Sequence, residues 1–339
     1  MDYRDAGVDI PAADQAKARI KVLARGTFND GVLSEIGSFG GMFRPDLARF
    51  REPVLVSSTD SVGTKIKVAI LAGVHDTVGY DIVAHCVNDI LVQGAVPLFF
   101  LDYLAVGRID VDRVEAIVRG VARGCAEFGC PLVGGETAQM PDVYAGDDYD
   151  LAGFIVGVVE RESALTGAAV REGDLLLGLP SAGLHTNGYT LARKVIFDTM
   201  GYRVDTLVPE LGTTVGEALL APHRAYLAAL EPLLDRRKVR GLVHITGGGF
   251  PGNVPRVLPA GLGARIRTSA WRVPPLFRII QGGGRVSDEE MYRTFNMGVG
   301  MVVIVAPGDL HDVEHSLERR GETAFVIGSV EAGAGVILE

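Results

Sequence analysis

A carboxylate and an ammonium group stand close together where an apolar run passes into a helical pattern. The run Val54-Leu55-Val56 predicts a short buried strand, and residues 64–71 predict a helix capped at Thr64. Asp60 and Lys65 lie in this connection, where free backbone N–H groups attract anions. Asp60 could hold a divalent cation and Lys65 a phosphate, as a metal–polyphosphate complex requires. The alternative is an ordinary surface turn, because a lone Asp and Lys at such a junction are common.

The predicted helix at 76–93 carries a polar stripe opposite a broad apolar side. On a helical wheel the stripe spans an arc of about 100°, and its members are Asp81, His85, Asn88 and Asp89. No Lys or Arg occurs in residues 68–107 to pair with these carboxylates. Burying such a stripe would be costly without a cation or other strong partners, so the pattern favours a metal site. A solvated helix face is the alternative.

A further carboxylate follows glycines at the end of a strand. Residues 131–133 predict the strand, and Gly134-Gly135-Glu136 comes directly after it. Glycines at a strand end let the backbone approach a ligand closely. We therefore expect Glu136 to point at the same ligand.

Two loops in the second half have the composition of anion-binding sites. The first occupies 180–188, between a strand and a helix predicted at 189–200. Ser181, His185 and Asn187 could hydrogen-bond an anion at the N-terminus of that helix. A capping or packed histidine is the alternative for His185.

The second loop has three consecutive glycines, Gly247, Gly248 and Gly249, between a strand and a short helix. Glycine loses more backbone entropy on folding than other residues. We therefore expect a nest of N–H groups around a phosphate, with Asn253 nearby and Arg256 as counter-charge. An ordinary wide turn is the alternative. The loop has neither the Walker A pattern nor the G-x-G-x-x-G spacing.

The chain has 339 residues. This length predicts two domains rather than a single domain with one hydrophobic core. Hydrophobic residues make up 47% and charged residues 22%, a balance typical of globular proteins. The 44 glycines come in clusters, which indicates tight loops and close backbone approaches. A net charge of −9 argues against a general nucleic-acid surface but leaves room for a small anionic substrate in a local positive pocket.

Composition divides the chain into three parts. Residues 1–50 predict an N-terminal arm with a glycine-rich loop, either a poorly packed segment or one that folds over a ligand with Lys17 or Lys21. Residues 51–165 predict an ATP- and metal-binding α/β domain, and residues 170–339 predict an α/β domain with the glycine-rich phosphate-binding loops. We expect an α/β (α+β) fold in which each domain has a mixed β-sheet with helices.

The cysteines and the apolar runs indicate the compartment. Cys86, Cys125 and Cys130 are odd in number and lack the spacing of a zinc site, which indicates a reducing compartment. The N-terminus is acidic where a signal peptide would be basic. The longest apolar runs fall far short of the roughly 18 residues that span a bilayer. We expect a cytoplasmic protein with no membrane association.

Carboxylates in the first half and anion cradles in the second fit a metal-bound nucleotide beside a phosphorylated substrate. Loops at the ends of strands are where α/β folds bind ligands, and phosphoryl transfer is the corresponding chemistry. Two other classes remain open. One is a two-metal phosphohydrolase that needs no ATP, built from Asp60, Asp81, His85, Asp89 and Glu136. The other is a nucleotide-sensing module without catalysis, which would tolerate loss of His185 and His244.

Six motifs, read in order along the chain, resemble one family. They are YRDAGVDI at 3–10, STDSVGTK at 58–65, VNDI at 87–90, LVGGETA at 132–138, LHTNGY at 184–189 and HITGGGF at 244–250. The chain resembles the phosphoribosylformylglycinamidine cyclo-ligases of purine biosynthesis, also called aminoimidazole ribonucleotide synthetases, over essentially its whole length. Ser61 departs from the family pattern, which has Gly there, and could shift how Asp60 points. Selenophosphate synthetase-like and thiamine-monophosphate-kinase-like enzymes share the architecture, but the histidine-bearing motifs match the cyclo-ligases.

The resemblance implies an ATP-dependent ring closure of formylglycinamidine ribonucleotide to 5-aminoimidazole ribonucleotide, with release of ADP and phosphate. The formyl amide oxygen would be phosphorylated, and the amidine nitrogen would then displace phosphate from the same carbon. ATP and Mg²⁺ are the implied cofactors. The resemblance also implies a homodimer in which the N-terminal-domain sheets of two chains meet, with a nucleotide site near that interface.

The same resemblance implies roles for individual residues. The expected magnesium ligands are Asp60, Asp89 and Glu136. The expected catalytic residues are His185 and His244, as proton carriers or oxyanion partners, together with Asp60. The expected nucleotide contacts are Lys65, Lys21, Gly63, Thr64 and Asn88. The expected substrate or phosphate contacts are Ser181, Asn187, Gly247, Gly248, Gly249, Asn253 and Arg256.

Overall fold

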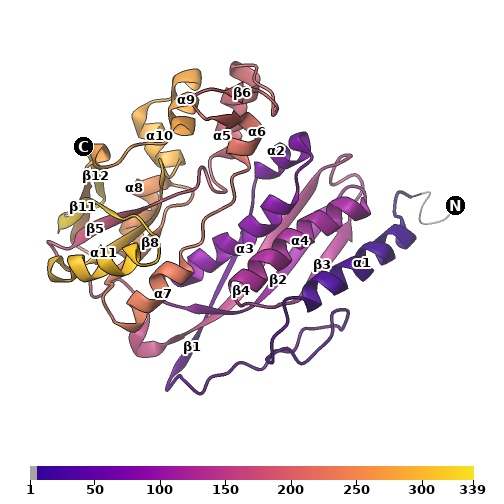
Figure 1. The fold of residues 1–339 in the computed structure, drawn as a ribbon, viewed down its shortest axis with the longest axis horizontal. Helices are drawn as coiled ribbons and strands as arrows, with labels where there is room; N and C mark the ends of the chain where they lie inside the picture. The colour runs from indigo at the N-terminus through magenta and orange to yellow at the C-terminus, as the bar shows by residue number, and fades with distance from the viewer. Residues whose placement is uncertain (1–5) are drawn as a thin grey trace.

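The computed structural model describes residues 6–339, apart from the side chain of Asp235. The acidic N-terminus and the start of the motif at 3–10 lie outside the described residues. Figure 1 shows two α/β units, the first coloured indigo to magenta and the second mainly orange and yellow. The predicted fold class, two α/β domains with a sheet in each, is confirmed.

The N-terminal domain is built on a 4-stranded sheet in the order β1-β4-β2-β3. β4 is antiparallel to both its neighbours, whereas β2 and β3 run parallel, so the sheet is mixed as predicted. The strands are β1 (Pro53–Ser61), β2 (Val96–Val106), β3 (Leu132–Gln139) and β4 (Tyr149–Glu160). The helices are α1 (Ile10–Arg25), α2 (Lys65–Ala72), α3 (Asp76–Leu91) and α4 (Val111–Glu127).

Helices α1, α3 and α4 lie side by side over this sheet (Figure 1). α3 is buried along most of its length because it packs against the sheet, α4 and the second domain. α3 and α4 cross so closely that two glycines are required. A Cβ on Gly79 would lie 2.0 Å from the Ile117 carbonyl oxygen, and one on Gly120 would lie 1.9 Å from that of Asp76. Such contacts fix the position of α3, which carries half of the polar site described below.

Gly120→Ala should therefore separate α3 from α4 and lower the free energy of unfolding by about 1–3 kcal/mol. Gly282→Ala, which lies in a different helix, is the matched control. A Cβ added to Gly282 would have no atom within 4 Å. We expect the control to retain or slightly gain stability, since alanine favours the helix. Urea denaturation of both variants checks this, and equal stability of the two would contradict the close packing.

The predicted strand at 54–56 forms, but it is not buried. β1 lies at the edge of the sheet, and Val54 and Leu55 are 38% and 65% exposed. The side chains alternate along the strand, so Val56, Ser58 and Asp60 face the helices. The apolar run signals a strand correctly, whereas its burial depends on neighbours that the run does not specify.

The C-terminal domain is built on a 6-stranded sheet in the order β12-β9-β11-β5-β10-β8. Only the β12–β9 pair is parallel, so this sheet is also mixed. The strands are β5 (Leu175–Pro180), β8 (Gly241–His244), β9 (Leu262–Ile266), β10 (Val299–Val305), β11 (Phe325–Ala332) and β12 (Val336–Leu338). A separate ribbon pairs β6 (Leu207–Val208) with β7 (Thr213–Thr214).

Short helices connect these strands. They are α5 (Tyr189–Arg193), α6 (Val215–Leu219), α7 (Leu227–Asp235), α8 (Gly249–Asn253), α9 (Pro275–Gly284), α10 (Asp288–Thr294) and α11 (Leu310–Glu318). α5 continues as a π-helical segment, Lys194–Thr199, so the helix predicted at 189–200 forms but is not uniformly α. Within residues 6–339, none of the helices combines the length and apolar character needed to cross a bilayer.

Buried polar contacts from α2 and α3 hold the C-terminal segment 221–226 against the N-terminal domain. Lys65 Nζ donates to the carbonyl oxygen of Ala221 at 2.9 Å and pairs with Asp81 Oδ2 at 2.7 Å. Asp81 Oδ1 in turn accepts from the backbone N–H of His223 at 2.6 Å. Both charged side chains are fully buried. Asp81 therefore belongs to the domain junction rather than to a solvated face.

Asn88, about two turns after Asp81 on the same stripe of α3, makes the second part of this junction. Its amide nitrogen donates to the carbonyl oxygen of Arg224 at 2.8 Å, and its oxygen accepts from the backbone N–H of Tyr226 at 3.0 Å. The two domains are thus joined by hydrogen bonds to backbone groups that would otherwise be buried without partners. The remaining members of the stripe, His85 and Asp89, face the polar site.

Candidate active site at the domain junction

A cavity of about 720 Å³ lies between the two domains. The N-terminal domain lines it with Ser57, Ser58, Asp60, Asp89, Val92 and Gln93. The C-terminal domain and its connection line it with Leu165, Thr166, Asn187, Thr246, Gly247, Arg256 and Val257. The cavity therefore brings together two of the predicted metal carboxylates and three of the predicted phosphate contacts.

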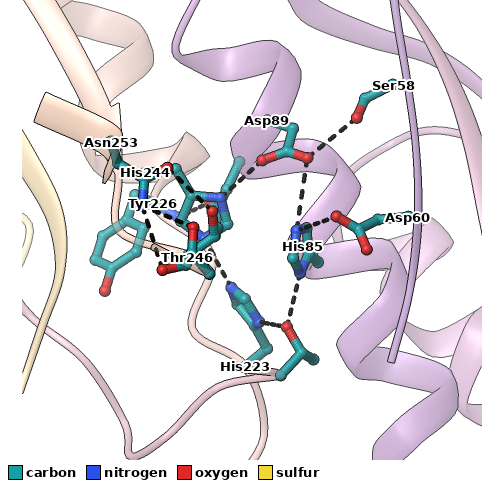
Figure 2. A network of polar contacts seen from close by, with 12 residues as sticks. Ser58, Asp60, His85, Asp89, His223, Tyr226, His244, Thr246 and Asn253 are labelled. Carbon is teal, nitrogen blue, oxygen red and sulfur yellow. Dashed lines mark hydrogen bonds and ion pairs between the residues drawn. The ribbon is translucent and has the colours of Figure 1, made fainter. Parts of the chain in front are cut away.

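Asp60 and Asp89 converge beside this cavity through two imidazoles, as Figure 2 shows. Asp60 Oδ2 lies 2.8 Å from His85 Nε2, and Asp89 Oδ1 lies 2.8 Å from His244 Nδ1. Asp89 Oδ2 accepts from Ser58 Oγ at 3.1 Å and lies 3.5 Å from His85 Nε2. Alternate positions of β1 supply Ser58 and Asp60, and positions one turn apart on α3 supply His85 and Asp89.

The ring nitrogens of His85 and His244 that do not face the carboxylates also have partners. His85 Nδ1 lies 2.7 Å from Thr186 Oγ1, and His244 Nε2 lies 3.1 Å from His223 Nε2. Thr186 Oγ1 is in turn 3.5 Å from His223 Nδ1. Each imidazole is therefore held from both sides. Neither His223 nor Thr186 was a predicted site residue: Thr186 lies inside the LHTNGY motif, but the sequence around His223 carries no signal.

The charges at the site follow from burial and from these hydrogen bonds. Burial favours the neutral carboxyls, but the hydrogen bonds from His85 and His244 outweigh it and lower the pKa of Asp60 and Asp89. Burial also disfavours charge on His85, yet its hydrogen bond to Asp60 and the nearby Asp89 raise the pKa of His85. Burial lowers the pKa of His244 despite its bond to Asp89. Two carboxylates thus face the cavity, with the imidazoles of His85 and His244 buried behind them.

His185 lies beside this cluster as a packed, neutral side chain. Its ring stacks on His223 with centroids 4.0 Å apart, and its Nε2 accepts from the backbone N–H of Ala182 at 3.2 Å. Burial lowers the pKa of His185 well below its usual range. The predicted role of His185 as a proton carrier does not agree with this geometry, because a backbone group already occupies its Nε2 lone pair.

Close packing explains two glycines of the loop at 247–249, which the sequence alone did not indicate. Gly248 and Gly249 have φ angles of 97° and 57°, and a Cβ on Gly249 would lie 1.8 Å from the Tyr292 carbonyl oxygen. These two glycines permit a left-handed turn and a close approach. Gly247, by contrast, lines the cavity. Of the three glycines predicted to bind a phosphate, only Gly247 therefore lies in the cavity wall.

Asn253 shapes this loop rather than facing the cavity. Its Nδ2 donates to the carbonyl oxygens of Gly249 at 2.8 Å, Thr246 at 3.2 Å and Gly247 at 3.3 Å (Figure 2). Arg256 Nη1 donates to Asn253 Oδ1 at 3.3 Å and is itself part of the cavity lining. Of the two predicted contacts, only Arg256 is in a position to meet a phosphate directly.

Two predicted nucleotide contacts are enclosed in the domain junction. Lys65 and Asn88 are fully buried, and their polar atoms are used by Asp81 and by backbone groups of segment 221–226. A phosphate cannot reach Lys65 Nζ in this arrangement, so both predictions disagree with the structure. The helical pattern after Lys65 was interpreted correctly, but the second domain that covers the side chain could not be anticipated from it.

Three further predicted contacts have local structural roles. Gly63 adopts φ of 54° in the turn after β1. The hydroxyl of Thr64 lies 3.0 Å from that of Thr190 and makes no cap hydrogen bond to α2. Ser181 Oγ lies 3.0 Å from both the Gly183 carbonyl oxygen and Asn296 Oδ1. None of the three lines the cavity at the domain junction.

Glu136 faces a different cavity, of about 940 Å³. Lining residues include Lys17, Lys21, Glu35, Gly37, Ser38, Phe39, Gly40, Gly41, Asp102, Glu136 and Phe154. β3 stands three strand positions from β1 in the sheet, which separates Glu136 from Asp60 by about 14 Å. The prediction that Glu136 shares a site with Asp60 and Asp89 therefore does not hold within one chain. The carboxylate set of the two-metal phosphohydrolase does not assemble either, since Asp81 pairs with Lys65.

Asp102 in this second cavity was not among the predicted site residues. It lies on β2 opposite Gly135, whose missing side chain leaves room for it: a Cβ there would lie 1.8 Å from Asp102 Oδ1. Burial raises the pKa of Asp102 to about 7. The second cavity therefore combines two lysines of α1 with two carboxyl groups of the sheet.

Two family models match the chain. AIR synthase related protein, N-terminal domain, matches residues 46–159, and AIR synthase related protein, C-terminal domain, matches residues 171–339. Among curated proteins, the phosphoribosylformylglycinamidine cyclo-ligase of Citrifermentans bemidjiense is 52% identical over 97% of this chain and 95% of that protein. The enzyme of the same name from Brevibacillus brevis is 49% identical over 98% of this chain and 96% of that protein.

Solved structures similar to this chain show the same fold at low identity. Thiamine-monophosphate kinase from Stenotrophomonas maltophilia has a TM-score of 0.70 at 17% identity and covers 96% of both chains. The hydrogenase maturation protein HypE in complex with ATP has a TM-score of 0.66 at 18% identity, covering 94% of this chain and 88% of that one. AaThiL complexed with AMPPCP and TMP has a TM-score of 0.60 at 16% identity, covering 84% and 83%.

Proposed function

Because the chain belongs to the phosphoribosylformylglycinamidine cyclo-ligase family, we propose that it converts formylglycinamidine ribonucleotide to 5-aminoimidazole ribonucleotide with ATP. The observation that carries this function is the identity of about half of all residues to curated enzymes of that name over nearly the whole chain. It is an ATP-dependent ligase of purine biosynthesis that forms a carbon–nitrogen bond. The cavity at the domain junction, with carboxylates on one side and Gly247 and Arg256 on the other, suits such a substrate.

The polar residues of this cavity fit a divalent cation bound to phosphate. Asp60 and Asp89 present carboxylate oxygens to the cavity, and oxygens are the ligands that Mg²⁺ prefers. When bound, Mg²⁺ would neutralise phosphate charge during transfer. Ser58 and His244 hold Asp89, and His85 holds Asp60, so both carboxylates are oriented before any ligand arrives.

His244 acts in this proposal as a positioning residue. Its Nδ1–H donates to Asp89, and its Nε2 accepts the Nε2–H of His223. Gly247, Asn187 and Arg256 would bind the substrate phosphate from the opposite wall.

The second cavity is our candidate for the nucleotide. Lys21 and Lys17 from α1 supply positive charge, Gly37, Gly40 and Gly41 supply adaptable backbone, and Glu136 supplies a carboxylate. The solved HypE structure contains ATP and the AaThiL structure contains AMPPCP, and both have this fold. Glu136 would then serve a cation on the nucleotide rather than one between Asp60 and Asp89.

We further propose that two copies of the chain pair through the N-terminal-domain sheet. β1 is an open edge strand, and Leu55 and Phe154 are 65% and 42% exposed on the sheet. An edge strand with exposed apolar residues is normally covered by a partner. The free, buried Cys86, Cys125 and Cys130 favour the cytoplasm as the location of this assembly.

ADP release measured with and without each substrate tests the function. We expect ADP only when formylglycinamidine ribonucleotide, ATP and magnesium are all present. Phosphate release from the ribonucleotide without ATP would instead indicate a hydrolase. Nucleotide binding without turnover of the ribonucleotide would indicate a sensor, and either result would overturn the proposal.

A further inference from the structure

We propose that His223 is a positioning residue for the cyclo-ligase reaction, because it holds the imidazole of His244 in the orientation that directs Asp89 toward the cavity. The inference rests on the proposed function and deepens it by adding a residue that no sequence motif indicates. Figure 2 shows His244 between Asp89 and His223. His223 is 1% exposed and does not line the cavity, so its effect on the reaction passes through His244.

The direction of each hydrogen bond follows from the Asp89 carboxylate. An ionised carboxylate only accepts, so His244 Nδ1, 2.8 Å from Asp89 Oδ1, carries a proton. Burial lowers the pKa of His244, and a neutral imidazole has a single N–H, so His244 Nε2 presents a lone pair. The donor in the 3.1 Å contact between the two Nε2 atoms is therefore His223.

The state of the His223 ring agrees with this direction. Burial lowers the pKa of His223 well below its usual range, so this ring also has a single N–H. With the proton on Nε2, the Nδ1 lone pair faces Thr186 Oγ1 at 3.5 Å. With the proton on Nδ1, the Nε2 lone pairs of His223 and His244 would face each other inside the protein, which leaves two buried acceptors unpaired.

The His223 ring is itself fixed by its backbone and by one ring face. Its backbone N–H donates to Asp81 Oδ1 on α3 at 2.6 Å. Its ring stacks on that of His185, with centroids 4.0 Å apart and planes inclined at 26°. Behind His185 lies Gly300, where an added Cβ would be only 2.5 Å from His185 Cε1. A donor that is held in this way can fix the plane of the ring to which it donates.

His244 needs this second contact because a single hydrogen bond would leave its ring free to pivot. His244 ends β8 of the C-terminal domain, whereas Asp89 belongs to α3 of the N-terminal domain. The segment that carries His223 is attached to α3 by Asp81 and Asn88. His223 therefore holds His244 in place relative to the helix that supplies Asp89.

Replacement of His223 by Met and by Gln separates positioning from packing. The two substitutes have similar length and volume, but only Gln can place an N–H near the position of the imidazole Nε2–H. We expect His223→Met to lower kcat by about 10- to 100-fold with little change in KM for ATP or the ribonucleotide. His223→Gln should recover most of that loss. Thermal unfolding of both variants shows whether either fails to fold.

A difference in kcat in favour of His223→Gln supports the inference. Equal kcat in the two variants overturns it, whether both match the parent chain or both fall, because packing alone does not distinguish an amide N–H from a thioether. A lower kcat in His223→Gln than in His223→Met overturns it as well.

Nitrogen-15 NMR of the parent chain, labelled at its 7 histidines, tests the same contact when a variant does not fold. We expect the Nε2–H tautomer for His223 and the Nδ1–H tautomer for His244, with His244 Nε2 showing the shift of a hydrogen-bonded acceptor. The Nδ1–H tautomer of His223, or the shift of a free lone pair at His244 Nε2, overturns the inference. Because NMR involves no turnover, either result leaves the proposed function standing. The expected tautomers in a parent chain that releases no ADP would refute the proposed function instead.

Discussion

Asp89→Asn should lower kcat by about 10³-fold while leaving the fold intact. The substitution keeps the shape of the side chain but removes the charge that faces the cavity, and preorganised charge of this kind contributes roughly 10²- to 10⁴-fold to rates. The Asn oxygen can still accept from His244 and the Asn amide nitrogen can donate to the Ser58 hydroxyl, so the junction between the domains should survive. We also expect the variant to need a higher magnesium concentration for half-maximal activity.

Steady-state ADP release by the variant, with thermal unfolding as the check on folding, measures this effect. Asp198→Asn is the matched control, because Asp198 lies in an exposed pair with Lys194 at 3.1 Å and such pairs contribute little. The control should keep normal kcat and KM. Unchanged kcat and unchanged magnesium dependence in Asp89→Asn would remove Asp89 from the site.

Lys65→Met should destabilise the protein by about 3–5 kcal/mol, because it leaves the buried carboxylate of Asp81 without its partner. Burial lowers the pKa of Lys65 and raises that of Asp81, and their attraction opposes both shifts. The double variant Lys65→Met/Asp81→Leu should recover much of the loss, since no unpaired charge remains. Urea denaturation of the two variants and of the parent chain measures the difference.

The same pair of variants decides between two roles for Lys65. Lys194→Met, which breaks only an exposed pair, should cost well under 1 kcal/mol and serves as control. If Lys65 instead contacts a nucleotide phosphate, Lys65→Met should unfold at the parent's urea concentration and show a raised KM for ATP. That outcome would reverse the assignment of Lys65 to the domain junction.

The sequence could predict the parts of the site that depend on local periodicity. One-turn spacing on α3 is enough to bring His85 and Asp89 to one face of that helix. Of the three predicted cradle glycines, Gly247 lies in the cavity wall at the end of β8, where ligand-binding loops of α/β folds are expected. These arguments need no knowledge of which elements are neighbours.

Predictions that depend on neighbouring elements failed. Glu136 lies inside β3 rather than after a strand. β4 and β2 lie between β3 and β1, and strand order is not written in local pattern. Lys65 has the right local setting for a phosphate contact, yet segment 221–226 covers it. His223 reaches the site only because this segment crosses α3, and no motif surrounds it.

The most direct test of the account is the fate of the formyl amide oxygen. If the enzyme phosphorylates that oxygen and the amidine nitrogen then displaces phosphate, substrate labelled there with oxygen-18 should transfer its label to inorganic phosphate, in equal amount to the imidazole product. Mass spectrometry of the released phosphate measures this directly. Unlabelled phosphate formed alongside the product would contradict the account, because the oxygen would then have left by another route.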